Sequence, residues 1–266
     1  MPTLMLTELL PGAQTICPIC NGRCYPAGDR SGLPRRLRDM KVFSPGRIPL
    51  NPCPTCGATD DERLIYLYLL HRTRAFEPTA PPLTILHMEP EPRLYETLQR
   101  VSRVSVRSEP SSQLPSLEVD DRSVDIVLCN DILDRVRDEA AALRSIRRVL
   151  KTDGLALVQS AVSSTLPATH EDAQLTTDTE RSKAFGSALR VRLYGADYAQ
   201  RLASAGFTVE RFRWWRGGRR FGGALRNRYA LVRGEVLYVI RPSTGHSPSG
   251  HSPSGRIGGE KLSPVP

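Results

Sequence analysis

Hydrophobic and polar positions along the chain predict a repeating order of strands and helices. Short apolar runs with β-branched residues, such as SVDIVLC at 123–129, are typical of buried parallel strands. Segments with apolar residues at helical spacing follow such runs, as in DEAAALRSIRRVL at 138–150, where arginines occupy the opposite face. This alternation predicts an α/β fold with helices on both faces of one sheet. Cys129, inside the first run, is expected to be a small core residue.

The expected elements extend over most of the chain. A helix is predicted to begin at Asp60 or Asp61, either of which can cap it, and a proline-rich linker at 76–82 follows that helix. Strands are expected at 83–86, 103–107, 123–129, 154–162, 207–214 and 234–242. Further helices are expected at 91–101, 138–150 and 195–207. Glycines at 154 and 206 are expected to end the last two helices.

The N-terminal cysteines predict a metal site. Cys17 and Cys20 form one C-x-x-C pair, and Cys53 and Cys56 form a second pair. Two such pairs offer four thiolates at the spacing of a tetrahedral, structural Zn²⁺ in a zinc ribbon. A disulfide framework is the alternative, but the chain shows no secretory signal that would place it in an oxidising compartment. Cys24 is a fifth thiol nearby, either a replacement ligand or a bystander.

These features divide the chain into three predicted parts. Residues 1–75 form the zinc-ribbon domain and a connecting helix, and residues 83–241 form the α/β domain. Residues 242–266 contain a tandem HSPSG repeat and are expected to be a disordered tail. The zinc is expected to act as a staple, because the N-terminal segment is too poor in large apolar residues to fold alone.

The net charge of +9 is compatible with either a solvated basic surface or an anionic partner such as nucleic acid. The segment RFRWWRGGRRFGGALRNRY at 211–229 mixes arginines with aromatic residues. It is expected to bind phosphates and bases, to form a mobile lid, or to bury its aromatic residues against the sheet. The alternation of Phe212 and Trp214 favours burial. Because no apolar run approaches the ~18 residues of a membrane span, a cytoplasmic protein without membrane contact is expected.

Taken in order, these motifs resemble the class I S-adenosylmethionine-dependent methyltransferases, and within them a bacterial subgroup with an N-terminal zinc ribbon. The subgroup's second knuckle and following helix resemble CPTCGATDDERLIYLYL. Its first motif, a strand that ends in a Pro-Glu turn instead of a glycine loop, resembles LTILHMEPEP. Its fourth strand and following helix resemble SVDIVLCNDILDRVRDEAAALRSIRRVL. The resemblance implies a Rossmann-like, doubly wound methyltransferase sheet with a small N-terminal zinc-ribbon domain.

The resemblance also implies a function and a cofactor site. It implies methyl transfer from S-adenosylmethionine to an unidentified acceptor. It assigns cofactor contacts to six residues at strand ends: His87, Glu89, Glu91, Glu109, Asn130 and Asp131. Glu89 is expected to face the cationic portion of the cofactor or to cap the next helix, whose N-terminus is expected to receive the cofactor carboxylate. Glu109 is a candidate for either a ribose or an adenine contact. No residue is assigned a catalytic role.

The chain departs from the subgroup in three places. The segment RVSVRSEPSSQ at 103–113 offers no clear Asp or Glu after an apolar strand, where these enzymes generally contact both ribose hydroxyls. After the fourth strand, NDILDRV replaces a turn that bears histidine and glutamate, and 185–195 lacks a Gln-x-Asp-His pattern. His170, Glu171 and Asp172 remain as candidates for an acceptor pocket or for a surface loop. These losses support a second hypothesis, in which the protein is a degenerate, non-catalytic relative that serves as a zinc-containing binding or scaffold module.

Overall fold

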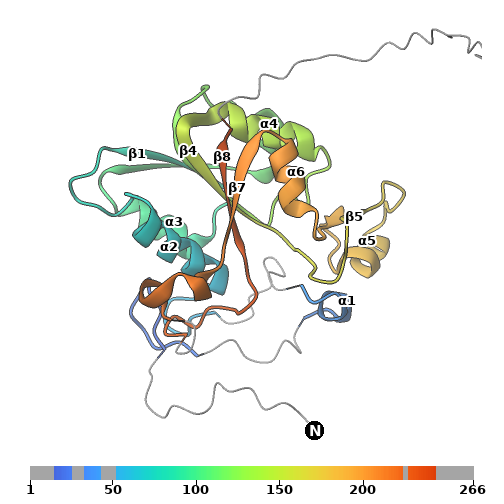
Figure 1. Cartoon of the computed structure of the whole chain (residues 1–266), viewed down its shortest axis with the longest axis horizontal. Helices are drawn as coiled ribbons and strands as arrows, with labels where there is room; N and C mark the ends of the chain where they lie inside the picture. The colour runs from blue at the N-terminus through green and yellow to red at the C-terminus, as the bar shows by residue number, and fades with distance from the viewer. Residues whose placement is uncertain (1–14, 26–32, 43–51, 224–226, 244–266) are drawn as a thin grey trace, which may run out of the picture.

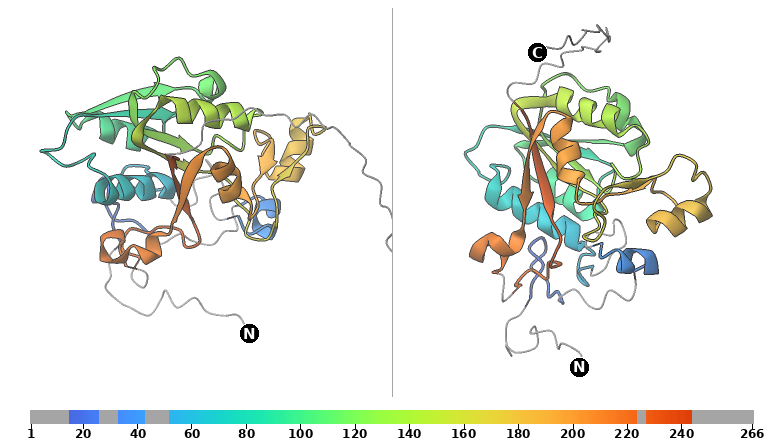
Figure 2. Two further views of the ribbon diagram at one scale, coloured as in Figure 1. Left: turned by 45° about the horizontal axis from the view of Figure 1, so that its top comes forward. Right: turned by 45° about the vertical axis from the view of Figure 1, so that its right-hand side comes forward.

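The computed structural model describes residues 15–25, 33–42, 52–223 and 227–243 (Figure 1). In this part of the chain a six-stranded sheet crosses the centre of the molecule, and helices cover both of its faces (Figure 2). The strand order is β2-β1-β3-β4-β8-β7. The first four strands are parallel to one another, and β8 is antiparallel to both of its neighbours. The α/β prediction is confirmed, and the mixed sheet fits a Rossmann-like fold.

The strands and helices of the described residues alternate along the chain. The main sheet contains β1 (Leu83–Met88), β2 (Val104–Glu109), β3 (Val124–Asn130), β4 (Leu150–Gln159), β7 (Phe207–Phe212) and β8 (Leu237–Pro242). A separate pair consists of β5 (His170–Glu171) and β6 (Arg192–Leu193). The helices are α1 (Arg35–Asp39), α2 (Asp60–Arg72), α3 (Pro92–Gln99), α4 (Glu139–Val149), α5 (Asp178–Phe185) and α6 (Tyr198–Ser204). Short 3₁₀ turns span Ser111–Ser116, Trp214–Arg216 and Gly218–Phe221.

Alternate residues of the parallel strands face two separate apolar cores. One core lies under α4 and α6 and includes Leu86, Val127 and Val158, together with Cys129, which is buried as predicted. The other lies under α2 and α3 and takes the intervening strand residues, such as Leu128. Since side chains alternate across a strand, burial on both faces requires the continuous apolar runs seen in the sequence.

The two predicted glycine stops have different outcomes. Gly206 follows α6 with φ +88°, a left-handed conformation that glycine adopts without strain. Gly154 does not end α4, because Leu150 is the C-cap and β4 begins at that residue. Gly154 lies inside β4, where a Cβ atom would stand 3.0 Å from the carbonyl oxygens of Asp125 and Lys151. The close approach of two backbones therefore explains this glycine.

The cap of α2 also differs from the prediction. The Thr59 hydroxyl accepts a hydrogen bond from Glu62 N, and the Glu62 carboxylate accepts one from Thr59 N, which forms a capping box. Neither Asp60 nor Asp61 is the N-cap residue. Both are buried at the start of the helix instead.

The described N-terminal residues pack against the segment that precedes β8. Ile16 N donates to Arg228 O at 2.8 Å. The fully buried guanidinium of Arg63 donates to Ala58 O at 2.8 Å and to Ala230 O at 3.0 Å. The cysteine-bearing segment is thus joined directly to the loop that precedes β8.

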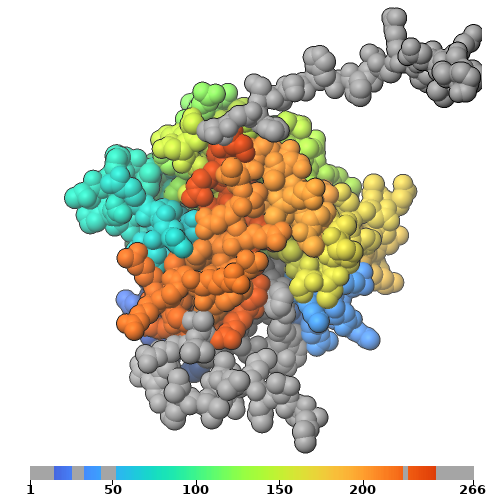
Figure 3. All heavy atoms as spheres, in the orientation of Figure 1, coloured from blue at the N-terminus to red at the C-terminus, as the bar shows by residue number. Residues whose placement is uncertain are grey.

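The arginine-rich segment after β7 buries its aromatic residues. Phe212, Trp214 and Phe221 are at most 4% exposed, and Trp214 Nε1 donates to Val232 O at 2.8 Å. Arg216 and Arg219 point to solvent. In the space-filling view this orange part of the chain spreads across one face of the molecule (Figure 3). Burial is confirmed, and base stacking on these three aromatic rings is excluded.

Parts of two predictions fall outside the described residues. Of the predicted zinc-ribbon domain, residues 1–14, 26–32 and 43–51 lie outside the described residues, and α1 falls between the two cysteine pairs with Leu37 fully buried. Of the expected tail, residues 244–266 lie outside the description. Among the described helices, none has the length and apolar character needed to cross a bilayer.

Candidate cofactor crevice and metal sites

The carboxyl ends of β1 and β3 form the candidate cofactor crevice. These two strands are hydrogen-bonded neighbours, yet the chain leaves β1 toward β2 on one side and leaves β3 toward β4 on the other. In open α/β sheets, ligands bind beyond the carboxyl ends of strands at this kind of topological switch point. All six residues that the sequence assigned to the cofactor lie at the carboxyl ends of β1, β2 and β3 or directly after them.

Three of those six residues bind one another. His87 Nε2 lies 2.7 Å from Glu91 Oε2, and Asn130 Nδ2 donates to Glu91 Oε1 at 3.0 Å. All three side chains are buried. Because Glu91 follows β1 and Asn130 ends β3, these hydrogen bonds fasten the two strand ends together. Both Glu91 carboxylate oxygens are occupied, so this network holds the ends of β1 and β3 in a fixed arrangement.

Glu89 forms an ion pair across the switch point. Its carboxylate accepts hydrogen bonds from Arg135 Nη2 at 2.8 Å and from Nη1 at 3.3 Å. The Glu89 side chain retains 29% exposure, and its backbone has φ +44°. Glu89 is not a helix cap, since Glu91 is the N-cap residue of α3. A cationic group does face Glu89, but here that group belongs to the protein.

Glu109 is the last residue of β2, whereas the sequence predicted a strand that ends at residue 107. It pairs in register with Met88, and its carbonyl accepts from Glu89 N at 2.7 Å. Its carboxylate binds Arg107 Nε at 2.6 Å. Strand pairing therefore brings an acidic side chain beside the end of β1, although RVSVRSEP has no strong apolar pattern to reveal it.

The N-terminus of α3 already holds an anion from the protein itself. Glu62 Oε1 accepts hydrogen bonds from Arg93 N and Leu94 N, each at 2.9 Å. The expectation that these N–H groups receive a cofactor carboxylate is therefore wrong. Helix N-termini favour negative charge, and α2 supplies it from the same glutamate that completes its own capping box.

Several buried acids beside the crevice were missed as a group. Asp60, Asp61 and Glu235 place carboxylate oxygens within 4.8 Å of one another. Burial raises the pKa of Asp61, and the neighbouring charge of Glu235 raises it further. Burial likewise raises the pKa of Asp131, with Asp61 as the next cause. Burial raises the pKa of Glu235 to about 7. The sequence shows Asp60 and Asp61 side by side, but their position before an apolar stripe predicted a helix cap and not a buried acidic cluster.

The acceptor candidates lie away from the crevice network. Glu171 accepts from Arg192 Nε at 2.8 Å, and with Asp172 it lines a pocket of about 180 Å³. His170 belongs to the short strand β5. Asp134, from the turn after β3, binds the buried Arg190 at 2.7 Å. The arginines of segment 185–195 therefore hold this insertion onto the main domain.

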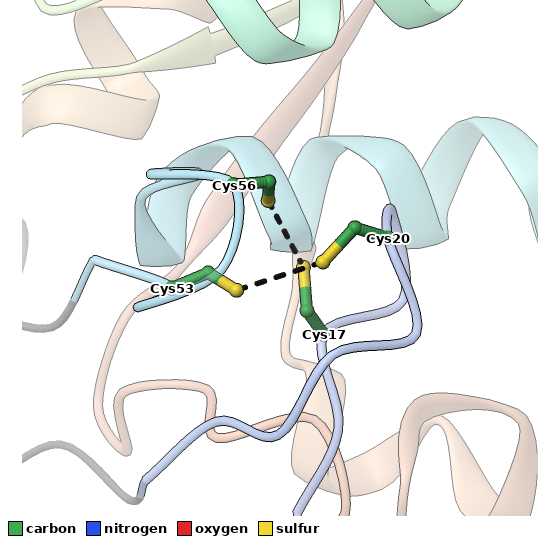
Figure 4. Close-up of side chains that lie close together, drawn as sticks. All are labelled: Cys17, Cys20, Cys53 and Cys56. Carbon is green, nitrogen blue, oxygen red and sulfur yellow. Dashed lines mark hydrogen bonds between the residues drawn. The ribbon is translucent and has the colours of Figure 1, made fainter.

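The four paired cysteines converge at the N-terminal end of α2 (Figure 4). Cys17 Sγ lies 3.8 Å from Cys56 Sγ, and Cys20 Sγ lies 3.6 Å from Cys53 Sγ. Four sulfurs at ~2.3 Å from one tetrahedral zinc would be about 3.8 Å apart. These separations fit a shared metal ion. Cys24 is buried in the same cluster, outside this set of four.

The thiols in this cluster differ in their proton affinity. Burial raises the pKa of Cys17 to about 12. Burial also acts on Cys53, but hydrogen bonds from the backbone N–H groups of Cys56 and Thr55 outweigh it and lower the pKa to about 6. Clustered thiols cannot all ionise without a compensating cation, and a metal ion provides that charge.

Comparison with protein-family models gives one result. Residues 96–206 match the model described as a methyltransferase domain, which spans less than half of the chain. The matched region runs from the middle of α3 to the end of α6 and contains β2, β3 and β4. The comparison with curated proteins found no match.

The comparison with solved structures includes a Burkholderia thailandensis 1,6-didemethyltoxoflavin-N1-methyltransferase with bound 1,6-didemethyltoxoflavin and S-adenosylhomocysteine. It is 14% identical, with 85% of this chain and 97% of that chain covered and a TM-score of 0.38. A putative methyltransferase from Bacillus halodurans is 14% identical over 68% and 99% of the two chains, with a TM-score of 0.40. The [4+2]-cyclase SpnF is 16% identical over 69% and 82%, with a TM-score of 0.39. Likenesses this distant assign no activity to the chain.

Proposed function

We propose that this protein transfers a methyl group from S-adenosylmethionine to an acceptor. The observation that carries the proposal is the acidic switch point between β1 and β3, at which Glu89 retains an accessible carboxylate. S-adenosylmethionine presents a sulfonium and an ammonium group, which a carboxylate attracts. The match of residues 96–206 to a methyltransferase domain model supports the same reaction class.

In the proposed complex, Glu89 faces the cationic portion of the cofactor. Glu109 accepts hydrogen bonds from the ribose hydroxyls, because it is the acidic residue at the end of β2. His87, Glu91 and Asn130 keep the strand ends in register through their mutual hydrogen bonds. The cofactor supplies a reactive methyl group on its sulfonium, so the protein's task is to align donor and acceptor and to exclude water.

We also propose a structural Zn²⁺ held by Cys17, Cys20, Cys53 and Cys56. Four thiolates complete a tetrahedral shell, which leaves no position for a reacting water. The metal would hold both cysteine loops against the start of α2, whose Glu62 and Asp61 reach toward the crevice. The ribbon's role in this proposal is mechanical, because it positions residues of α2 beside the cofactor site.

Calorimetric titration with S-adenosylhomocysteine tests the proposed cofactor site. We expect wild-type protein to bind it, and Glu89→Gln to weaken binding by about tenfold, since a lost charge-assisted contact corresponds to roughly 1.4 kcal/mol. Glu96→Gln is the matched control, because Glu96 is an exposed carboxylate on α3 that pairs with Arg93. Absence of heat with the wild-type protein at millimolar ligand would contradict the proposal.

A second candidate function is a non-catalytic scaffold that retains this fold. Two observations favour it: Arg135 neutralises Glu89, and Glu62 occupies the N-terminus of α3. In this alternative the protein's own side chains permanently replace the cofactor's charged groups. The exposed Arg216 and Arg219 would then serve as a contact surface for an anionic partner such as nucleic acid. Failure of both the wild type and an Arg135 variant to bind S-adenosylhomocysteine would favour this candidate.

A further inference from the structure

The buried acids beside the crevice form a second cluster with the composition of a metal site. Asp60 and Asp61 begin α2, and Glu235 immediately precedes the residues that lead into β8. Their carboxylate oxygens lie within 4.8 Å of one another, and the three residues are 3%, 6% and 0% exposed. Carboxylates this close repel one another strongly in the interior unless a proton or a cation lies between them.

Asp131 provides an independent indication of a ligand. It is 3% exposed, and neither of its carboxylate oxygens has a hydrogen-bond partner. After burial, the charge of Asp61 has the largest influence on Asp131, and Asp131 in turn acts on Glu235. Its carboxylate therefore belongs to the same electrostatic cluster. A buried carboxylate is ordinarily hydrogen-bonded, so two vacant oxygens require an explanation.

Gln159 adds a further unsatisfied oxygen. Its Nε2 binds Glu235 Oε1, which aims the amide at the cluster, while its own buried Oε1 has no hydrogen-bond partner. Gln159 is the last residue of β4, and Asp131 directly follows β3. Through its hydrogen bond to Glu235, Gln159 therefore brings the end of β4 to the acids from the start of α2 and from the segment before β8, and Asp131 acts on them through its charge.

Two buried arginines, Arg63 and Arg190, offset only part of the charge of these four carboxylates. Arg63 acts on Asp60, but its two terminal nitrogens donate to the carbonyls of Ala58 and Ala230. Arg190 acts on Asp131, yet its Nε is bound to Asp134 at 2.7 Å. The excess of buried negative charge is the condition under which proteins coordinate metal ions.

We propose that Asp60, Asp61 and Glu235 bind a hard divalent cation of the Mg²⁺, Mn²⁺ or Ca²⁺ type, with the Gln159 carbonyl oxygen as a further ligand and the buried charge of Asp131 beside the site. Carboxylate and amide oxygens without any nitrogen or sulfur donor are the ligands that such cations prefer. This site is distinct from the four-cysteine site, whose thiolates select a softer metal. The cation would join α2 to the carboxyl edge of the sheet, and its binding does not depend on methyl transfer.

Titration of the full-length protein with Mn²⁺ tests this proposal, with free Mn²⁺ followed by electron paramagnetic resonance. Ca²⁺ and Mg²⁺ are compared by thermal shift, and zinc content is measured throughout so that the four-cysteine site stays constant. We expect about one tightly bound Mn²⁺ per chain and a rise in melting temperature with at least one of the three ions. Glu235→Gln should weaken binding by about tenfold or more, the scale on which changes around metal ligands act. The control Asp121→Asn alters an exposed carboxylate and should change nothing.

Two results would overturn the proposal. One is the absence of binding by all three cations at millimolar concentration in a folded wild-type protein. The other is unchanged Mn²⁺ affinity in both Glu235→Gln and Asp131→Asn, which would place the bound ion elsewhere. Neutralising a carboxylate also removes buried repulsion, so these variants should fold and show a higher melting temperature than the cation-free wild type. If Glu235→Gln and Asp131→Asn raise the melting temperature but no cation raises that of the wild type, then protons alone occupy the cluster.

Discussion

The guanidinium of Arg135 binds the carboxylate of Glu89 through both of its terminal nitrogens, at 2.8 and 3.3 Å. Arg135 comes from the turn after β3, whereas Glu89 directly follows β1, so the pair closes over the switch point between these strands. Any cationic ligand that approaches Glu89 must therefore share or displace this arginine. The pair acts as an internal competitor for the proposed cofactor.

Removal of that competitor should strengthen cofactor binding. We expect Arg135→Ala to bind S-adenosylhomocysteine about fivefold more tightly than the wild type, because a partly exposed ion pair contributes roughly 1 kcal/mol. Isothermal titration calorimetry measures the difference. Arg93→Ala is the control, since Arg93 forms a comparable ion pair with Glu96 on the exposed face of α3. Equal or weaker binding by Arg135→Ala would show that the arginine does not compete.

The four-cysteine cluster should hold about one zinc per chain. We expect Cys53→Ser to lose the metal and Cys24→Ser to retain it, because Cys24 is a buried thiol outside the set of four. Zinc content is measured by elemental analysis of freshly purified, reduced protein. A zinc-free wild type, or equal zinc loss in both variants, would contradict this assignment.

Loss of the zinc should also loosen a distant part of the chain. Ile16 is hydrogen-bonded to Arg228, and Arg63 joins Ala58 to Ala230. We therefore expect Cys53→Ser to increase hydrogen exchange at residues 15–25, 52–58 and 227–232 while β1, β3 and β4 stay protected. Exchange confined to the cysteine loops would show that the loop before β8 is held independently.

Stability in the absence of divalent cations should fall as the pH rises from about 5 to about 8. Burial raises the pKa of Glu235 from 4.5 to about 7, so the folded protein binds a proton that the unfolded chain has released. The stability from this proton is complete below about pH 4.5 and is lost as pH rises through 7. At 1.36 kcal/mol per unit, the loss is up to about 3 kcal/mol.

Urea denaturation at several pH values measures that loss, with a chelator of hard cations present and zinc content monitored. Glu235→Gln cannot ionise and should reduce the pH dependence, with the remainder coming from Asp61 and Asp131, whereas Asp121→Asn should leave it unchanged. A wild-type stability that is constant or rises over this pH range would show that the cluster does not take up a proton on folding.

Glu62 should be important for stability because it serves two helices. Its carboxylate completes the capping box of α2 and also accepts hydrogen bonds from Arg93 N and Leu94 N of α3. We expect Glu62→Ala to lower the free energy of unfolding by about 2 kcal/mol, the scale of lost hydrogen bonds to a buried charged group. Urea denaturation should show a lower midpoint with an unchanged slope. The control Glu96→Ala should lie within about 0.5 kcal/mol of the wild type.

The sequence by itself determined the order and the approximate bounds of the six strands of the main sheet and of α2, α3, α4 and α6. Local periodicity is sufficient for this purpose, because a strand covered on both faces needs a continuous apolar run and a packed helix needs an apolar stripe. The run around Cys129 and the stripe on α4 show this directly. The two C-x-x-C pairs likewise predicted that four sulfurs would meet. The spacing within each pair is a local property that suits a shared metal ion, and the four sulfurs do lie together in the structure.

Only the tertiary structure decided which polar side chains meet. Glu89 and Arg135 lie on separate strand-to-helix connections, and Asp61 and Glu235 are far apart in the sequence. Strand order and crossovers set such contacts, and these depend on the packing of the whole sheet rather than on any local pattern. For the same reason Asp60 and Asp61 suggested a helix cap in the sequence but are buried acids in the folded protein, where Thr59 takes the capping role.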